Sequence, residues 1–91
     1  MKIEKISWDQ ETVDHIFNHL VSPEEVEEVL FNEVDTPLMM RGKECKYIAY
    51  GKTRGGRLLF IVWALKYKKT KIITARDMTE KEKRFYRRRK E

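Results

Sequence analysis

The stretch Leu58-Leu59-Phe60-Ile61-Val62-Trp63-Ala64-Leu65 decides the fold of this chain. Its eight residues are all apolar and are rich in branched and aromatic side chains. The run is far shorter than the roughly 20 residues that cross a bilayer as a helix, and it is also short for a buried helix. We therefore predict a central strand that is buried on both faces.

Strand-like runs lie on both sides of this central strand. They cover residues 44–51 and 70–76, and the turn Thr53-Arg54-Gly55-Gly56 joins the first run to the central strand. Glycine supplies the positive φ angles that tight hairpin turns require. Residues 67–69 link the central strand to the last run. Cys45, at the start of the first run, is expected to pack in the core as a small apolar residue.

A capping box marks the start of a helix that precedes the strands. Ser22 suits the N-cap, Pro23 suits the first helical position, and Glu25 completes the box. The apolar face of this helix consists of Val26, Val29 and Leu30. The sequence therefore predicts a helix that begins at Pro23, followed by a loop over residues 32–37.

Two further helices are predicted, one towards each end of the chain. A second capping box, Thr79 with Glu82, opens a C-terminal helix that ends in the basic run 87–90. Near the N-terminus, Ser7 or Asp9 caps another helix. That helix has an apolar face with helical spacing, formed by Val13, Ile16, Phe17 and Leu20.

The order of these elements indicates the fold class. Residues 2–8 alternate apolar and polar side chains and are predicted to form a short edge strand. The order strand, two helices, three strands and helix is typical of an α+β fold with an antiparallel sheet. At 91 residues we expect one domain, residues 1–91. A single cysteine excludes an intrachain disulfide, and no secretory signal or membrane span is recognised, so a cytoplasmic location is expected.

The charge is distributed unevenly along the chain. Residues 1–40 contain two basic and ten acidic residues, whereas residues 41–91 contain eighteen basic and five acidic residues, so the net charge of +5 combines −8 with +13. The basic half favours a polyanion such as RNA or DNA as a partner. The alternative is a solvated lysine-rich surface, but a purely solubilising surface would mix charges of both signs.

Three other kinds of site are disfavoured. Gly51-Lys52-Thr53 lacks the glycine that a phosphate-binding loop needs at position 46, which is lysine. His15 and His19 share one helical face, but no third nitrogen or sulfur ligand is nearby in sequence, so we expect no metal and no cofactor. Cys45 has no neighbouring histidine and shows no nucleophile pattern.

Residues suited to RNA chemistry are concentrated in the basic half. The arginines whose planar guanidinium suits phosphate include Arg54, Arg57, Arg76 and Arg84. The aromatic residues Tyr47, Tyr50, Phe85 and Tyr86 either stack on unpaired bases or belong to the core, and the core is favoured for Phe85. In the acidic half, His15 and His19 are suited to proton transfer near neutral pH, although either one alone is also explained as an ordinary exposed histidine.

The order of short motifs along the chain resembles that of a known family. The motifs are Trp8-Asp9, His19-x-Val21-Ser22-x-Glu24-Glu25, Gly51-Lys52-Thr53-x-x-Gly56-Arg57, Ile72-Ile73-Thr74-Ala75-Arg76 and Glu82-x-x-x-Tyr86. Together they resemble the BrnT family, the toxins of type II toxin–antitoxin pairs. The resemblance covers nearly the whole chain, and Ala75-Arg76 followed by Thr79-x-x-Glu82-x-x-x-Tyr86 is its most specific part.

The resemblance implies a RelE-like ribonuclease fold with a basic cleft. It also implies an RNA substrate, a cognate BrnA-like antitoxin, and promoter DNA that is bound only through that antitoxin, and it leaves a homo-oligomer open. The positions that match the family's pattern are His19, Arg57, Arg76, Glu82 and Tyr86. Further residues expected to bind substrate are His15, Lys52, Arg54 and Arg84.

The first helix departs from the family pattern. The family usually has a lysine and an asparagine there, whereas this stretch is one residue shorter and His15 stands near the asparagine's position. Leu20 stands where the family has a glycine after the histidine. The chain is therefore closer to a sibling group with the pattern His-Ile-x-x-His-x-Val-Ser-Pro-Glu-Glu-Val.

Three hypotheses about function remain open. In the first, a metal-independent endoribonuclease toxin, His19 transfers protons while Arg57 and Arg76 stabilise the phosphate. Glu82 or Tyr86 then positions the substrate or assists proton transfer. The second is a non-catalytic module whose basic half binds RNA or a protein. The third, compatible with the first, is that the basic half binds an acidic segment of the antitoxin.

Overall fold

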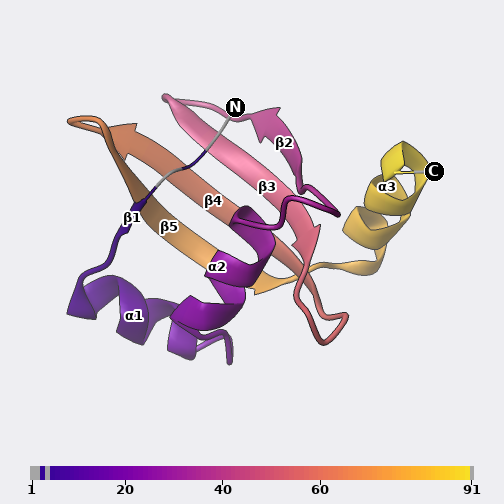
Figure 1. Cartoon of the computed structure of the whole chain (residues 1–91), viewed down its shortest axis with the longest axis horizontal. Coiled ribbons are helices and arrows are strands. Elements are labelled where there is room, and N and C mark those ends of the chain that lie inside the picture. The colour runs from indigo at the N-terminus through magenta and orange to yellow at the C-terminus, as the bar shows by residue number, and fades with distance from the viewer. Residues whose placement is uncertain (1–2, 4, 91) are drawn as a thin grey trace.

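The chain folds around a five-stranded sheet with the strand order β1-β5-β4-β3-β2 (Figure 1). The computed structural model describes residue 3 and residues 5–90. Its strands are β1 (Ile6–Ser7), β2 (Leu38–Arg41), β3 (Lys46–Lys52), β4 (Leu58–Lys66) and β5 (Lys69–Asp77). Its helices are α1 (Gln10–Phe17), α2 (Pro23–Leu30) and α3 (Glu80–Lys90).

The sheet is mixed rather than purely antiparallel, which corrects the prediction. The pairs β2–β3, β3–β4 and β4–β5 are antiparallel. The edge strand β1 instead runs parallel to β5, with Ile6 opposite Thr70. The predicted edge strand is therefore present, and the α+β class with two N-terminal helices and one C-terminal helix is confirmed.

The sequence did not reveal β2, which forms the other edge of the sheet and pairs with β3. Its methionines carry little strand preference, and pairing with β3 decides its conformation. The predicted strand 44–51 begins only at Lys46, because Glu44 and Cys45 form a turn with φ angles of 56° and 61°. Cys45 is exposed in this turn, so its predicted core position is wrong.

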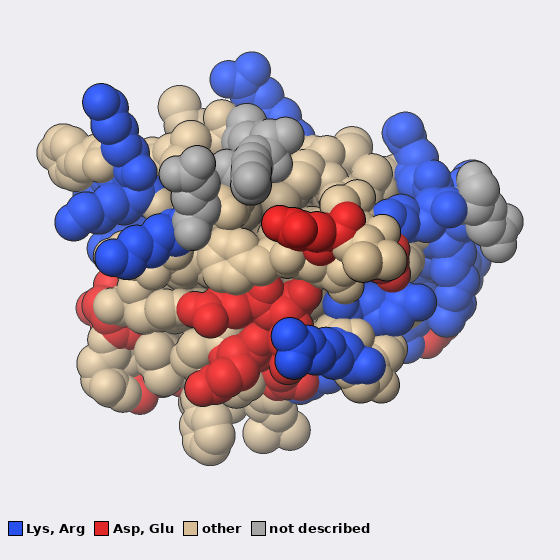
Figure 2. Space-filling model, viewed as in Figure 1, with Lys and Arg blue, Asp and Glu red and all other residues tan. Residues whose placement is uncertain are grey.

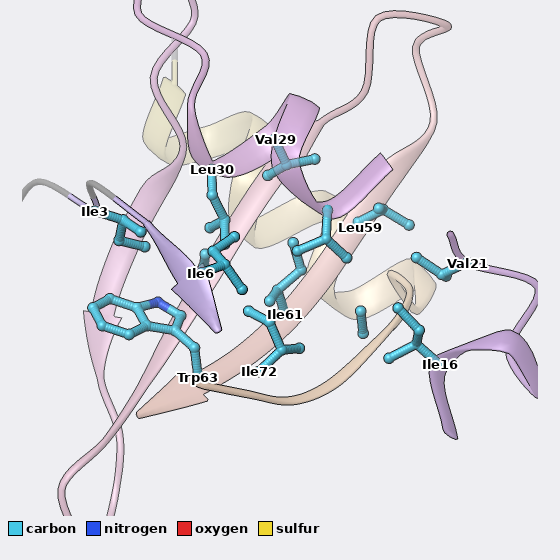
Figure 3. Close-up of a cluster of buried hydrophobic side chains, with 13 residues drawn as sticks. Ile3, Ile6, Ile16, Val21, Val29, Leu30, Leu59, Ile61, Trp63 and Ile72 are labelled. Atoms are coloured by element: carbon cyan, nitrogen blue, oxygen red, sulfur yellow. The ribbon is translucent and has the colours of Figure 1, made fainter. Parts of the chain in front are cut away.

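Strand β4 is central, as predicted, but only one of its faces is fully buried. Leu59, Ile61 and Trp63 on that face are 0% exposed, and they form the core with residues from α1 and α2 (Figure 3). The other face is half-buried, and Leu65 is 49% exposed. Helix α3 does not cover that second face completely, which explains the difference from the prediction.

Helix α2 begins at Pro23 with the predicted capping box and packs closely on β3. Ser22 Oγ accepts from the Glu25 backbone, and the Glu25 carboxylate accepts from the Ser22 backbone. A Cβ built on Gly51 would lie 2.5 Å from Val29 Cγ1. Gly51 is therefore required for the contact between helix and sheet, which gives it a packing role.

Helix α1 ends in a backbone arrangement that overturns part of the predicted apolar face. Asp9 caps its start, and Ile16 is fully buried. The Val21 N–H donates to the Ile16 carbonyl and the Leu20 N–H donates to the Phe17 carbonyl. This is the Schellman pattern, with Leu20 at the left-handed position where glycine is favoured. Its φ is 59°, so Val21 enters the core in its place and Leu20 turns outward.

Candidate active site

Arg57 lies just before β4 and uses all three of its guanidinium nitrogens. Its Nε and Nη2 donate to the two carboxylate oxygens of Asp77 at 2.6 and 3.1 Å. Its Nη1 donates to both carboxylate oxygens of Glu25 at 3.2 Å. The backbone carbonyls of Leu20 and His19 accept from Nη1 and Nη2 at 2.6 and 3.2 Å. We call these five residues the Arg57 network.

The Arg57 network connects the turn after α1 to α2 and to the end of β5. The hydrogen bond between Arg57 and Asp77 raises the pKa of the arginine and lowers the pKa of the carboxyl. A phosphate at Arg57 would have to displace a carboxylate or a carbonyl from the guanidinium. These contacts give Arg57 a structural function at the position where the sequence suggested a phosphate ligand.

His15 and His19 lie at the exposed end of α1. Their rings meet edge to face, with centroids 5.6 Å apart. Strand β1 pairs with Thr70 and Lys71 of β5, and α1 packs beside β5. The Nε2 of His15 therefore lies 3.1 Å from Oγ1 of Thr74. Within the described residues, no three His, Cys, Asp or Glu side chains are grouped as metal ligands would be.

Arg76 and Glu82 form a second group, on β5 and the first turn of α3. Nη1 and Nη2 of Arg76 donate to the two carboxylate oxygens of Glu82 at 2.8 and 3.0 Å. The guanidinium lies over the Phe60 ring, 4.1 Å from its centroid. Glu82 also accepts from the Thr79 backbone at 2.8 Å, so the predicted capping role and the pairing with arginine coexist. The hydrogen bond from Arg76 lowers the pKa of Glu82.

Aromatic side chains surround the Arg76–Glu82 pair. The Tyr50 ring lies 5.4 Å from Phe60 and 5.3 Å from Phe85, measured between centroids. Burial raises the pKa of Tyr50, the charge of Glu82 raises it further, and Arg76 lowers it. We call Tyr50, Phe60, Arg76, Glu82 and Phe85 the Arg76 cluster. Phe85 is half-buried within it and is not part of the buried core, so the core role favoured for that residue is wrong.

The Arg57 network and the Arg76 cluster lie on opposite faces of the sheet. Arg76 and Asp77 are successive residues of β5, opposite Phe60 and Leu59 in the register. Successive side chains of a strand point to opposite faces, so Asp77 shares the face of the buried Leu59 and Arg76 shares the face of Phe60. The proposed catalytic residues therefore fall into two groups, His19 with Arg57 and Arg76 with Glu82.

Tyr86 belongs to neither group. It is 5% exposed on the inner side of α3, the helix that packs near β2. Burial and the charge of Asp35 raise the pKa of its hydroxyl. The structure gives Tyr86 the surroundings of a packing residue, so a direct contact with substrate would require α3 to move.

The residues expected to bind substrate are dispersed. Lys52 is 4.0 Å from a carboxylate oxygen of Asp35. The backbone of Arg54 donates to Glu28, and its side chain borders a groove of about 640 Å³. That groove is otherwise lined by Glu24, Glu27, Glu28, Phe31, Asn32 and Glu33. Only Arg84, exposed on α3, belongs to the basic helix beside the Arg76 cluster.

The surface charge follows the division of the sequence into halves. Figure 2 shows acidic side chains gathered over α2 in the middle of one face, with basic side chains directly beside them and further basic side chains over α3 and towards the β4–β5 hairpin. Arg87, Arg88, Arg89 and Lys90 make the last turn of α3 strongly basic. The Arg76 cluster therefore adjoins positive charge, whereas the Arg57 network adjoins the acidic helix α2.

The chain matches the model of a known protein family. The family described as the ribonuclease toxin BrnT of type II toxin–antitoxin systems matches residues 8–82, a range that includes His19, Arg57, Arg76 and Glu82. The chain belongs to the BrnT family. A search of curated proteins gave no significant match. Membership of the BrnT family makes the chain a toxin of this class, with a cognate antitoxin as its partner.

Sequence reasoning missed two features of the candidate site. Tyr50 was assigned to base stacking or to the core, and its place beside Arg76 follows from the register, which sets Tyr50 opposite Phe60 and Phe60 opposite Arg76. Glu25 was assigned only to helix capping, and its contact with Arg57 spans 32 residues. No helix among the described residues combines the length and the hydropathy needed to cross a membrane.

Proposed function

We propose that this BrnT-family toxin is a metal-independent endoribonuclease whose active site is the Arg76 cluster. The observation that carries the proposal is the bidentate Arg76–Glu82 pair, with oxygen–nitrogen distances of 2.8 and 3.0 Å, on an aromatic sheet face beside the basic helix α3. The pair supplies a cation and a carboxylate at one place. Aromatic rings beside them offer stacking surfaces for unpaired bases.

The reaction requires three groups. The ribose 2′-oxygen attacks the neighbouring phosphorus while its proton passes to a base, and the bond from phosphorus to the 5′-oxygen breaks as that oxygen gains a proton. The products are a 2′,3′-cyclic phosphate and a 5′-hydroxyl. We assign the base to the Glu82 carboxylate, the acid to the Tyr50 hydroxyl, and stabilisation of the phosphate charge to Arg76. Arg76 then exchanges Glu82 for phosphate when RNA binds.

A second location for proton transfer is the His15–His19 pair. The contact of 3.1 Å between His15 and Thr74 places this pair along β5, the strand that carries Arg76. Its surroundings on α1 and α2 are acidic, which disfavours RNA there. His19→Gln therefore belongs in the same assay as the variants of the Arg76 cluster.

The test is cleavage of labelled single-stranded RNA in EDTA, with the new ends identified. We expect wild type to leave cyclic or 3′-phosphate ends. We expect Arg76→Lys and Glu82→Gln to be slower by about 100-fold or more, and Tyr50→Phe by about 100-fold. Arg41→Ala is the matched control, because Arg41 is exposed at the end of β2 and outside the cluster.

Three other outcomes of this assay would contradict the proposal. Loss of cleavage in His19→Gln, with Arg76→Lys unaffected, moves the site to α1. Equal cleavage by wild type and every variant indicates contamination or a wrong site. Tight, salt-sensitive RNA binding without product supports the non-catalytic binding module instead.

A further inference from the structure

Two large apolar side chains project into solvent where α1 ends. Phe17 is 69% exposed and Leu20 is 74% exposed. They lie one turn apart, since the Leu20 N–H donates to the Phe17 carbonyl at 2.8 Å. We call these two residues the α1-end patch. Single exposed apolar residues are ordinary on protein surfaces, but this pair is held in a defined conformation.

The backbone of the α1-end patch is fixed from two sides. The Val21 N–H donates to the Ile16 carbonyl, and both side chains are buried in the core. Arg57 donates to the carbonyls of His19 and Leu20 at 3.2 and 2.6 Å. Leu20 keeps a φ of 59°, a conformation that is unfavourable for a residue with a branched side chain. The fold thus maintains an unfavourable backbone conformation while Leu20 stays outside the core.

The charge around the α1-end patch indicates its partner. Residues 8–40 contain nine acidic residues and neither lysine nor arginine. Asp14 and Glu24 are exposed, one on α1 a turn before Phe17 and the other at the start of α2. This surface repels a polyanion, so RNA does not fit it. A protein segment with apolar side chains next to lysines or arginines does.

We propose that the α1-end patch is a docking site for the cognate antitoxin, which inserts an apolar segment flanked by basic residues against Phe17 and Leu20. Large apolar residues in a preformed turn suit the centre of such an interface, because little conformational freedom is lost on binding. Asp14 and Glu24 face the basic residues of the partner at the rim. The site is separate from the Arg76 cluster, and the proposal does not depend on the cleavage chemistry.

The test measures binding of the purified cognate antitoxin to the full chain by titration calorimetry. We expect Phe17→Ser and Leu20→Gly each to weaken binding about 10- to 100-fold. Val34→Ser is the matched control, because Val34 is 99% exposed in the loop after α2. The affinity of this variant for the antitoxin should stay within about twofold of wild type. The double variant Asp14→Asn, Glu24→Gln should weaken binding at low salt and reduce its salt dependence.

Leu20→Gly also separates docking from folding. Glycine adopts the left-handed conformation without strain, so this variant should melt at or above the wild-type temperature while binding antitoxin less tightly. RNA cleavage by Phe17→Ser alone should equal that of wild type, because Phe17 belongs to neither group of site residues, but the antitoxin should no longer inhibit it at stoichiometric concentration. If wild type cleaves no RNA, calorimetry still tests the docking site.

Three results would overturn the proposal. Wild-type affinity in both Phe17→Ser and Leu20→Gly would remove the α1-end patch from the interface. Loss of binding only in Arg87→Gln, Arg88→Gln would place the antitoxin on α3, as an acidic segment on the basic half. Self-association of wild type that Leu20→Gly abolishes, with antitoxin affinity unchanged, would make a second copy of this chain the occupant.

Discussion

At the scale of single residues, the Arg57 guanidinium is hydrogen-bonded to four other residues at once. Its five N–H donors form a planar fork that lysine does not reproduce. Arg57→Lys keeps the charge but loses the simultaneous contacts to Asp77, Glu25 and the two carbonyls. We expect a loss of about 2 kcal/mol in the free energy of unfolding, because part of the network is solvent-exposed. In a domain of this size the melting temperature should fall by about 10 °C.

The matched control for this change is Arg54→Lys, since the Arg54 side chain is exposed and only its backbone contacts Glu28. Its melting temperature should stay near that of wild type. If Arg57→Lys melts normally and loses RNA affinity instead, Arg57 is the phosphate ligand that the sequence suggested.

The Arg76–Glu82 pair makes stability depend on pH. The hydrogen bond from Arg76 holds the pKa of Glu82 below its ordinary value of 4.5. A carboxyl with a lower pKa in the folded than in the unfolded protein stabilises the fold above its unfolded pKa, and this contribution disappears as pH falls through the folded pKa. The wild-type melting temperature should therefore drop below about pH 4.5, measured by circular dichroism.

Glu82→Gln should have a lower melting temperature at pH 7 and a flatter decline on acidification. Asp77, whose pKa is also lowered, accounts for part of the remaining decline. Glu80→Gln is the matched control, an exposed glutamate in the same turn of α3. An identical pH profile in wild type and Glu82→Gln would show that the pair adds nothing to stability.

At the scale of elements, the β4–β5 hairpin turns through Tyr67 and Lys68, whose φ angles are 52° and 64°. Two-residue turns with both angles positive favour asparagine and glycine. Lys68→Gly should therefore raise stability by about 1 kcal/mol and the melting temperature by about 4–8 °C. Lys69→Gly, one residue further into β5, should lower it, because glycine weakens a strand. A decrease in both variants would contradict the turn conformation.

At the scale of the whole molecule, the sequence predicted what depends on local signals. Both capping boxes, the start of α2 and the central position of β4 follow from neighbouring residues and are present. The position of Leu20 was not predictable from helical spacing, because the spacing assumes that the helix continues. The partners of Arg57 were not predictable either, because they lie 20 to 38 residues away from it in the sequence.

The separation of charge also gives a prediction for the whole molecule. If RNA follows α3 to the Arg76 cluster, the arginines of its last turn contact phosphates. Each phosphate contact contributes about 0.7 to the slope of log affinity against log salt for single strands. The triple variant Arg87→Gln, Arg88→Gln, Arg89→Gln should therefore reduce that slope by about 2. The probe is a 2′-O-methyl RNA, which lacks the free hydroxyl required for cleavage. Removing three charges from the hairpin, at Lys66, Lys68 and Lys69, is the matched control, and a larger effect there would place the RNA at the opposite end of the molecule.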